Sequence, residues 1–286
     1  MRVEKLKCDA RKKLSDVIFG NLGLSYNVIR KIIRNKDVKI NDKRVSDDVL
    51  VMVGDIVTIY FQEFQRPRIE IVYQDENVIV VYKKRSIETV SDVGQSLQSL
   101  LSEQINKDCY AVHRLDRNTE GLIIFALNQE SKKELDLAFK NRTIDKYYLA
   151  IVNGLFAKKT DTLTAYLKKD SDKSLVYISD EQRKGYEKII TEYKVLKEIL
   201  QTSLVEVKLV TGKTHQIRAH LSHVGHFIIG DEKYGDSKVN KIYKKKYQCL
   251  CSYKMKFNFK AGSKLYYLNK IILELEKEKI DFCQNL

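Results

Sequence analysis

The sequence predicts an α+β fold, in which a mixed, largely antiparallel central sheet with peripheral helices follows a small α/β module. Residues 188–197 and 203–210 alternate apolar and polar side chains, which is typical of paired strands. Strands that follow one another without regular helical crossovers favour such a sheet. The single proline, Pro67, lies in a polar stretch that indicates a boundary between two domains.

The segment before the proline carries two predicted helices, because apolar residues recur there at helical spacing. Ser25 is a plausible N-cap for the second of them. The predicted elements are a helix over residues 10–20, a helix over 25–35, a hairpin over 38–45 and a strand over 56–61. We therefore expect a module over residues 1–62, a linker over 63–68 and a second domain over 69–286.

The second domain is predicted as strands mixed with a few helices. Asn128 can cap a helix over residues 129–140, and the polar residues 170–185 are expected to form an irregular surface segment. The other predicted elements are strands over residues 110–112, 122–127 and 143–152 and a helix over 214–224. Together they give the strand-rich second domain expected above.

A polar turn, residues 113–122 with the sequence HRLDRNTEGL, lies between two of these predicted strands. It places Asp116 between Arg114 and Arg117, and a carboxylate beside arginines stays ionised. Such an Asp on a loop supported by a rigid sheet can act as a nucleophile or base. An ordinary turn with solvated arginines would contain the same residues, so the chemistry alone leaves both interpretations open.

The 286 residues carry a net charge of +14, which is typical of a nucleic-acid-binding protein, although many lysine-rich proteins are basic without binding RNA. The chain contains no run of about twenty apolar residues that could span a membrane, and residues 1–13 do not resemble a signal peptide. Its five cysteines are scattered and odd in number, which is typical of reduced thiols. We therefore expect a cytoplasmic protein.

The HRLDRNTEGL segment resembles the HRLDxxTSGL signature of the RluA-type pseudouridine synthases, which isomerise uridine in ribosomal or transfer RNA. Further segments resemble that family in the same order: residues 72–83, 146–150, 211–221, 225–235 and, more weakly, 250–257. The resemblance covers roughly residues 70 to 258. The N-terminal order of helix, helix, hairpin and strand is similar to the small RNA-binding module of ribosomal small-subunit protein four.

The family resemblance implies a mixed sheet with an active-site cleft across its middle and a reaction that needs no cofactor or metal. It implies that Asp116 starts cleavage of the N1–C1′ glycosidic bond, that Arg218 pairs with Asp116, and that Tyr148 stacks on the base. It assigns substrate binding to His113, Arg114, Leu115, Arg117, Thr119, Lys213, His215 and Gln216. Large-subunit ribosomal RNA is the expected substrate, with transfer RNA as the alternative.

Two groups of basic residues are candidates for phosphate contacts, which give affinity but little sequence information. The first is Arg30, Lys31 and Arg34, on one side of the second predicted helix. The second is Lys244, Lys245 and Lys246, within a stretch over residues 238–270 whose aromatic residues we expect to lie mostly in the core. An ordinary solvated helix face is the alternative for the first group. RNA is the expected partner of a monomer, with no DNA and no membrane.

The chain departs from the family pattern at four positions. Glu120 stands in place of Ser, Lys84 and Phe227 in place of Pro, and Cys251 in place of His. A catalytically idle RNA-binding protein is one rival interpretation, although it would not need the three predicted catalytic residues. A hydrolase or glycosidase is another, and Glu120 would then supply the second carboxylate that such enzymes use.

A metal site is the remaining alternative, because four histidines cluster in the sequence between residues 215 and 226. No carboxylate or cysteine nearby completes a known ligand spacing. Imidazoles that contact a substrate phosphate or cap a turn are the favoured interpretation, and we expect no metal.

Overall fold

The computed structural model describes residues 2–24, 26–61, 68–91 and 95–284. The predicted N-cap at Ser25 and most of the predicted linker, residues 63–67, lie outside the described residues. The chain forms two compact units: an N-terminal unit of residues 1–68 with 91–95, and a C-terminal unit of residues 69–90 with 96–286. Each unit is described by itself.

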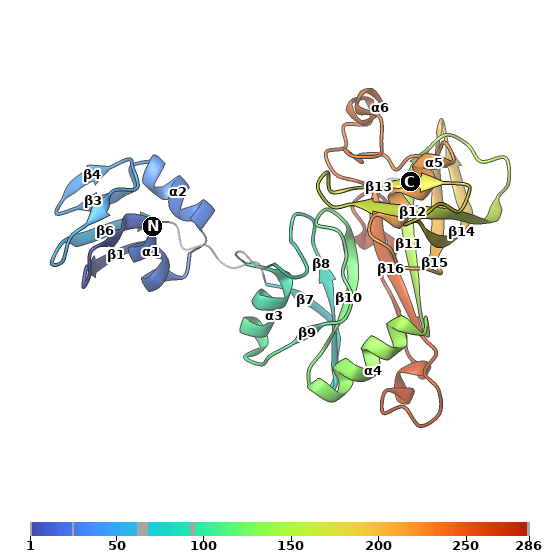
Figure 1. The fold of residues 1–286 in the computed structure, drawn as a ribbon, viewed down its shortest axis with the longest axis horizontal. Coiled ribbons are helices and arrows are strands. Elements are labelled where there is room, and N and C mark those ends of the chain that lie inside the picture. Colours follow the sequence, from blue (N-terminus) through green and yellow to red (C-terminus); the bar gives the residue numbers. More distant parts are fainter. Residues whose placement is uncertain (1, 25, 62–67, 92–94, 285–286) are drawn as a thin grey trace. The chain divides into compact units, whose positions relative to one another are not determined.

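The N-terminal unit packs two helices against a sheet with strand order β1-β6-β3-β4 (Figure 1). Its elements are β1 (Arg2–Lys7), β2 (Lys12–Lys13), α1 (Leu14–Leu22), α2 (Tyr26–Arg34), β3 (Val38–Ile40), β4 (Lys43–Val45), β5 (Leu50–Val51) and β6 (Ile56–Phe61). Apolar side chains at helical spacing, among them Val17 and Ile18 in α1 and Ile29 and Ile33 in α2, form its core with the sheet. The first helix begins later than predicted, because Lys12 and Lys13 pair with β5.

The C-terminal unit is built on a mixed sheet of 11 strands within the described residues. Its strands are β7 (Glu70–Gln74), β8 (Val78–Lys83), β9 (Tyr110–Ala111), β10 (Glu120–Ala126), β11 (Ile144–Asn153), β12 (Thr160–Asp170), β13 (Leu175–Ser179), β14 (Glu187–Ile199), β15 (Thr202–Leu209), β16 (Leu250–Phe257) and β17 (Ile272–Glu274). Its helices are α3 (Leu97–Ile105), α4 (Gln129–Lys140), α5 (Gln216–His223), α6 (Ser237–Ile242), and the 3-10 turns η1 (Tyr266–Lys270) and η2 (Lys277–Lys279).

The main path of the sheet runs β13-β12-β14-β15-β11-β16-β10-β8-β7, and all of its pairings are antiparallel except the one between β10 and β16. The predicted fold class is therefore confirmed. The predicted helix over residues 129–140 matches α4, and the Asn128 side chain caps it by accepting the backbone N–H of Ser131 at 2.8 Å.

Several strands escaped the prediction, among them two neighbours in the sheet of the C-terminal unit. β12 was not predicted, and β13 lies within residues 170–185, which were expected to be irregular. The alternating burial of β13 explains why it forms, because the buried side chain of Val176 packs into a small cluster with Leu167 of β12 and Ile189 of β14. The many polar residues on both sides of this short segment concealed that alternation.

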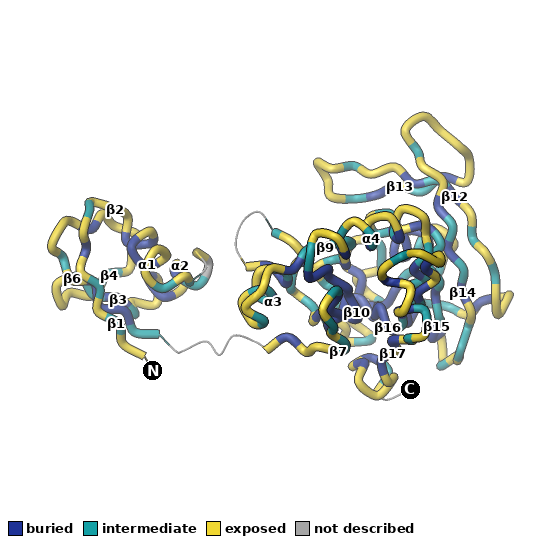
Figure 2. Tube along the Cα trace, turned by 90° about the horizontal axis from the view of Figure 1, so that it is seen from below, coloured by how far each residue is buried: buried dark blue, intermediate teal, exposed yellow. Residues whose placement is uncertain are grey.

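The core of the C-terminal unit lies around β8 and β10 (Figure 2). All seven residues of β10 are buried, and Val78–Val81 of β8 are buried as well. A strand that is covered on both faces consists of a continuous apolar run, as these two do. α4 contacts β10 and β9, and it begins two residues after the buried Leu127.

The parallel pairing of β10 and β16 consists of only two residue pairs, Glu120 with Cys251 and Gly121 with Ser252. Gly121 has a φ of +117°, and a Cβ added to it would lie 2.2 Å from the carbonyl oxygen of Ser252. Only glycine fits this close approach. The pairing therefore fixes the end of the 113–119 loop beside β16.

No helix in the described part of the chain is long and apolar enough to cross a membrane. Of the seven aromatic residues in the stretch over residues 238–270, Tyr253, Phe257 and Phe259 are buried, whereas Tyr266 and Tyr267 are exposed, so fewer of them lie in the core than expected. Lys244, Lys245 and Lys246 are exposed after α6.

Candidate active site

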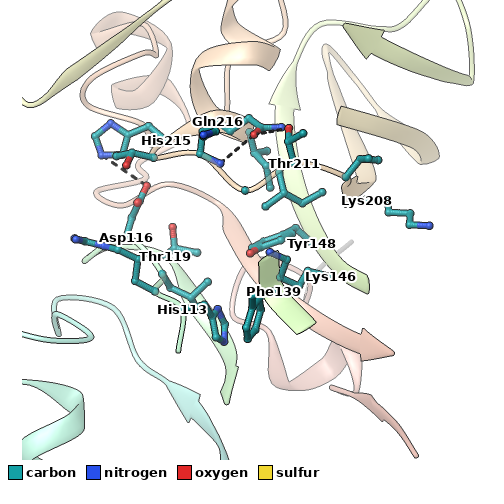
Figure 3. Close-up of a pocket in the computed structure, with 18 of the residues that line it drawn as sticks. His113, Asp116, Thr119, Phe139, Lys146, Tyr148, Lys208, Thr211, His215 and Gln216 are labelled. Atoms are coloured by element: carbon teal, nitrogen blue, oxygen red, sulfur yellow. Dashed lines mark hydrogen bonds and ion pairs between the residues drawn. The ribbon is translucent and has the colours of Figure 1, made fainter. Parts of the chain in front are cut away.

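A cavity of about 670 Å³ opens in the C-terminal unit between the 113–119 loop, β11 and the segment that leads into α5. Figure 3 shows Asp116 and His215 on one side of this cavity and Tyr148, Lys146 and Phe139 on the other. The three predicted catalytic residues all line it. Residues far apart in the sequence therefore meet at one site.

Asp116 lies on a loop that a buried lysine supports from below. The fully buried Nζ of Lys83 donates to the backbone carbonyl oxygens of Lys84 at 3.1 Å, Arg117 at 2.9 Å and Thr119 at 2.7 Å. The N–H of Thr119 donates to the carbonyl oxygen of Asp116 at 3.0 Å and closes a turn. Because an ammonium has three protons, Lys83 satisfies all three acceptors and fixes the loop.

The charge beside Asp116 comes from Arg218 on α5. Arg218 Nη1 donates to Oδ2 of Asp116 at 2.8 Å, while its Nε and Nη2 donate to the two carboxylate oxygens of Asp231 at 2.6 Å and 2.9 Å. The side chain of Arg218 is 7% exposed and that of Asp231 is 1% exposed. The arginines that flank Asp116 in the sequence, Arg114 and Arg117, are both exposed instead.

The pKa values of Arg218 and Asp231 both favour the charged forms of these side chains. Burial alone would lower the pKa of Arg218, but its hydrogen bonds and attraction to Asp231 and Asp116 outweigh burial and raise it. Burial likewise works to raise the pKa of Asp231, and the hydrogen bonds from Arg218 and two backbone N–H groups hold it below its usual value. Both groups therefore stay ionised in the buried network.

Tyr148 lies at the facing wall, 5% exposed, and burial raises the pKa of its hydroxyl. The register between β11 and β16 shifts between Tyr147 and Tyr148. Tyr147 does not line the cavity, and the ammonium groups of Lys208 and Lys254 lie 5.8 Å and 5.7 Å from its ring centre. Only one of the two tyrosines therefore reaches the site.

Several residues assigned to substrate binding line the cavity, but their side chains already stack on, or form hydrogen bonds with, other residues of the protein. The ring of His113 stacks on Phe139 with 4.6 Å between centroids, and its Nε2 accepts the N–H of Ile124 at 3.2 Å. Burial lowers the pKa of His113 to about 3, so its imidazole is neutral at neutral pH. Leu115 is buried beneath the loop, and Thr119 Oγ1 accepts Gln248 Nε2 at 2.6 Å.

Gln216 and Lys213 also have protein partners. Gln216 Oε1 accepts from Thr211 Oγ1 at 2.9 Å and from the N–H of Lys213 at 3.1 Å, and its Nε2 donates to the carbonyl of Ile190 at 3.0 Å. The ammonium of Lys213 forms an ion pair with Glu187. Gln216 therefore shapes the wall formed by residues 211–213.

Arg114 lines the cavity with its side chain exposed, whereas Arg117 does not line it. The backbone carbonyl of Arg117, an acceptor for Lys83, is the part of this residue that serves the loop.

The sequence interpretation missed Lys83, Lys146 and Asp231. Lys146 lines the cavity with its ammonium 5.2 Å from the ring centre of Phe139, and burial lowers its pKa to about 8. All three residues lie inside segments that resemble the family, so the signal was present. What the sequence did not give was the partner of each side chain.

Glu120 does not line the cavity. It is buried, pairs with Arg85 and accepts the hydroxyl of Tyr82 at 3.0 Å through Oε2. In the parallel pairing of β10 and β16, Glu120 lies opposite Cys251. Two of the departures from the family pattern are therefore neighbours. Glu120 is not placed to act as a second carboxylate in the cavity.

The clustered histidines contact different partners. His215 Nδ1 lies 2.8 Å from the Tyr234 hydroxyl, and His220 Nδ1 lies 2.9 Å from Thr191 Oγ1. His223 pairs with Asp180, and His226 stacks on Phe156. In the described ranges, no group of three or more His, Cys, Asp or Glu side chains is arranged to bind a metal ion.

Comparison with known proteins identifies the family. Residues 77–223 match the family model described as RNA pseudouridylate synthase. An uncharacterized RNA pseudouridine synthase of Mycoplasma genitalium is 31% identical over 240 residues, which cover 78% of this chain and 78% of that protein. Ribosomal large subunit pseudouridine synthase C of Vibrio vulnificus is 28% identical over 232 residues, covering 73% and 72%. The chain is therefore an RNA-modifying isomerase and belongs to the RNA pseudouridylate synthase family.

Solved structures share the fold. Human RNA pseudouridylate synthase domain containing 1 superposes with a TM-score of 0.61 at 23% identity, covering 78% of this chain and 90% of that one. Human RNA pseudouridylate synthase domain containing 4 gives a TM-score of 0.59 at 20% identity, covering 72% and 88%. These likenesses support the predicted sheet architecture.

Proposed function

We propose that this pseudouridine synthase isomerises uridines in large-subunit ribosomal RNA and that Asp116 is its catalytic group. The observation that carries this proposal is the position of Asp116 in the cavity, on a loop anchored by Lys83 and beside the guanidinium of Arg218. A carboxylate that is charged, aimed and within reach of a bound base can start the reaction. Tyr148 on the facing wall supports the same assignment.

The reaction rearranges bonds within one nucleotide. The target base leaves its stack, at a cost of a few kcal/mol, and enters the cavity, where Arg114 at the rim helps to retain the flipped arrangement. Asp116 initiates cleavage of N1–C1′, the uracil turns, and C5 bonds to C1′. The C5 proton leaves and N1 gains a proton, so no atom is gained or lost overall. Tyr148 stacks on the base, and its hydroxyl assists removal of the C5 proton.

Ribosomal RNA is proposed as the substrate because several relatives are named ribosomal large subunit pseudouridine synthase C. The N-terminal unit is proposed to be an RNA-binding module like that of ribosomal small-subunit protein four, over residues 1–62. A linker over 63–68 would then join it to the catalytic domain over 69–286. The exposed positions of Arg30, Lys31 and Arg34 on α2 support phosphate contacts. We further propose that the protein works as a cytoplasmic monomer.

A second basic surface is proposed to contact RNA near α6. Lys241, Lys244, Lys245 and Lys246 line a cavity of about 750 Å³ together with Asn240 and acidic residues. Asn240 anchors this region, since its side chain accepts the N–H of Gly230 at 2.7 Å and donates to the carbonyl of Asp231 at 3.0 Å. The lysines beside Asn240 are therefore held near the Asp231 segment, and there they can bind phosphates that flank the target nucleotide.

The experiment is to incubate the purified full chain with RNAs labelled with tritium at C5 of uridine. Large-subunit ribosomal RNA, small-subunit ribosomal RNA and transfer RNA would come from cells that lack this gene. Isomerisation releases tritium and leaves pseudouridine in the RNA, whereas a glycosidase would release free uracil. We expect tritium release from large-subunit RNA, with the positions mapped by sequencing.

Release from transfer RNA alone would reassign the substrate. Binding without release from any RNA would favour a catalytically idle protein of the same fold and would overturn the catalytic role of Asp116.

A further inference from the structure

His215 is hydrogen-bonded to Tyr234 and lies beside Asp116. His215 Nδ1 lies 2.8 Å from the Tyr234 hydroxyl, and its Nε2 lies 3.9 Å from Oδ2 of Asp116 (Figure 3). The side chain of His215 is 13% exposed and lines the catalytic cavity. The two ring nitrogens therefore face different partners, and the position of the ring proton determines what Asp116 meets.

The Tyr234 hydroxyl determines that proton's position. Its oxygen accepts the backbone N–H of Val176 on β13 at 2.9 Å. Its own proton is then free to be donated, and Nδ1 of His215 is the acceptor in reach. If Nδ1 were the donor instead, the Tyr234 proton would have no acceptor among the hydrogen bonds of the described residues. This arrangement favours the neutral tautomer of His215 with its proton on Nε2, the nitrogen nearer Asp116.

Arg218 and His215 both face the same carboxylate oxygen of Asp116. Arg218 Nη1 donates to Oδ2 at 2.8 Å, and the Nε2 proton of His215 faces that same oxygen. In the part of the chain that the structure describes, no hydrogen bond reaches Oδ1 of Asp116. A separation of 3.9 Å is long for a hydrogen bond, and such contacts commonly shorten when substrate fills a site.

The backbone conformation of His215 indicates that its ring is required at this position beside Tyr234 and Asp116. Its φ is +53°, in the left-handed region that costs energy for residues other than glycine. The residue occupies the N-cap position of α5, yet its side chain makes no capping hydrogen bond. The strained backbone is therefore not explained by helix capping, and the ring instead spans from Tyr234 to Asp116.

We propose that His215 is a positioning residue for Asp116, held by Tyr234 as the neutral Nε2–H tautomer, so that Oδ2 faces two donors and Oδ1 is the oxygen that meets the substrate. The inference rests on the proposed catalytic role of Asp116. It also assigns Tyr234, which has no other role in the reaction, to the orientation of the imidazole. The charged groups that face His215 are Asp116, Asp231, Arg218 and Lys233.

The neutral state agrees with the surroundings. Burial, the largest influence, lowers the pKa of His215 below its ordinary value, and the positive charges of Arg218 and Lys233 act in the same direction against the two aspartates. The imidazole therefore carries one proton near neutral pH, and Tyr234 selects its nitrogen.

The first test needs no RNA. The full chain, labelled with ¹⁵N in its histidines, is examined by NMR near neutral pH, and His215→Asn identifies the His215 signals by their loss. We expect a protonated Nε2 and an unprotonated Nδ1 in the wild type. Tyr234→Phe should move the ring toward the Nδ1–H tautomer and raise its pKa, because the donor to Nδ1 is gone. A wild-type ring protonated on Nδ1 would overturn the proposal.

The second test is kinetic. His215→Asn suits the left-handed backbone and can still accept from Tyr234, but it lacks a donor that reaches Asp116. We expect kcat for tritium release from RNA to fall about tenfold to a hundredfold, the effect of one hydrogen bond to a charged group, with KM nearly unchanged. His223→Asn is the matched control, since His223 lies at the other end of α5 and pairs with Asp180 outside the cavity.

A raised KM with unchanged kcat in His215→Asn would show that the imidazole binds a substrate phosphate, and it would contradict the positioning role. If the wild type releases no tritium while NMR finds the Nε2–H tautomer, the proposed function fails, but the assigned hydrogen bond from Tyr234 to His215 is retained. The two failures are therefore distinguishable.

Discussion

Arg218 gives two of its three nitrogens to Asp231, with hydrogen bonds of 2.6 Å and 2.9 Å. This bidentate pair fixes the guanidinium plane before any substrate is present. One nitrogen, Nη1, remains for Asp116. Asp231 therefore orients the arginine, and the arginine orients the proposed catalytic carboxylate. Preorganised charges of this kind need little rearrangement during a reaction.

Asp116→Asn should abolish isomerisation and leave RNA affinity largely intact. The substitution preserves shape but removes the charge and basicity that start the reaction, so the rate of tritium release should fall at least about a hundredfold. Arg218 retains Asp231 as its partner, so the fold should persist. Pseudouridine formation above a few per cent of the normal rate would remove Asp116 from its assigned role.

Tyr148→Phe should impair catalysis, whereas Tyr147→Phe should not. Tyr148 lines the cavity and Tyr147 lies outside it against lysine side chains. Kinetics with saturating RNA would separate the two, because Phe keeps the ring for stacking and removes only the hydroxyl. A catalytic defect in Tyr147→Phe without one in Tyr148→Phe would show that the assignment is off by one residue.

Lys83→Met should destabilise the C-terminal unit by about 1–3 kcal/mol, because three buried carbonyl oxygens lose their donor. The free energy of unfolding would be measured by denaturant titration. Lys84→Met is the matched control, since Lys84 is the exposed neighbour and only its backbone takes part in the network. An equal loss of stability in the two variants would contradict the role of Lys83.

The same lysine gives a pH dependence with a definite sign. Burial lowers the pKa of Lys83 to about 8, against roughly 10.4 in the unfolded chain. Between these values the unfolded state binds more protons, so stability should rise with pH. Lys146, with its pKa also lowered to about 8, contributes in the same direction. Thiols whose pKa values are raised by burial, those of Cys109, Cys249, Cys251 and Cys283, act in the opposite direction, so the test is a difference between variants. The free energy of unfolding of the wild type minus that of Lys83→Met should rise between about pH 8 and 10.

Glu120→Gln should reduce stability without changing the reaction. Its ion pair with Arg85 is buried on the Glu120 side and about one-fifth exposed on the arginine side, which suggests a loss of about 1–3 kcal/mol. At a temperature where the variant is folded, tritium release should stay within about threefold of normal. Loss of activity in a fully stable variant would instead indicate that Glu120 takes part in the chemistry.

Replacing Arg30, Lys31 and Arg34 with Gln in the full chain should weaken RNA binding and leave turnover at saturating RNA unchanged. Each lost phosphate contact should flatten the dependence of log affinity on log salt by about 0.7 to 0.9. The control replaces Lys132, Lys158 and Lys159, which removes the same charge elsewhere. Equal salt slopes in the two variants would mean that α2 does not contact phosphates.

The sequence predicted the residues of the cavity better than their partners. Asp116, Tyr148 and Arg218 could be selected because each lies in a motif with fixed spacing, and the structure places all three in one cavity. The arginine beside Asp116 was expected from Arg114 or Arg117 on chemical grounds alone. The observed partner is Arg218, 102 residues further along the chain, which the family resemblance predicted and which reasoning from neighbouring residues could not have found.

The secondary structure shows the same division. α4 was predicted with its cap because a helix end is encoded by adjacent residues. β12 and β13 were missed because β13 is the edge strand of the sheet and β12 lies next to it, and much of each strand is exposed, so that the apolar alternation is weak. Propensity in such strands depends on cross-strand neighbours that the sequence does not identify.

The parallel pairing of β10 and β16, which consists of two residue pairs, also affects when the enzyme becomes active during folding. It joins the sheet segment that follows the Asp116 loop to the segment that carries Arg218, between residues that are 131 positions apart in the chain. Closing so long a loop is entropically costly and slow. A chain synthesised only as far as β15 already contains Asp116, Tyr148 and β10, yet it lacks the strand that unites the sheet. We therefore expect the nascent protein to be unable to isomerise uridine until β16 has been made.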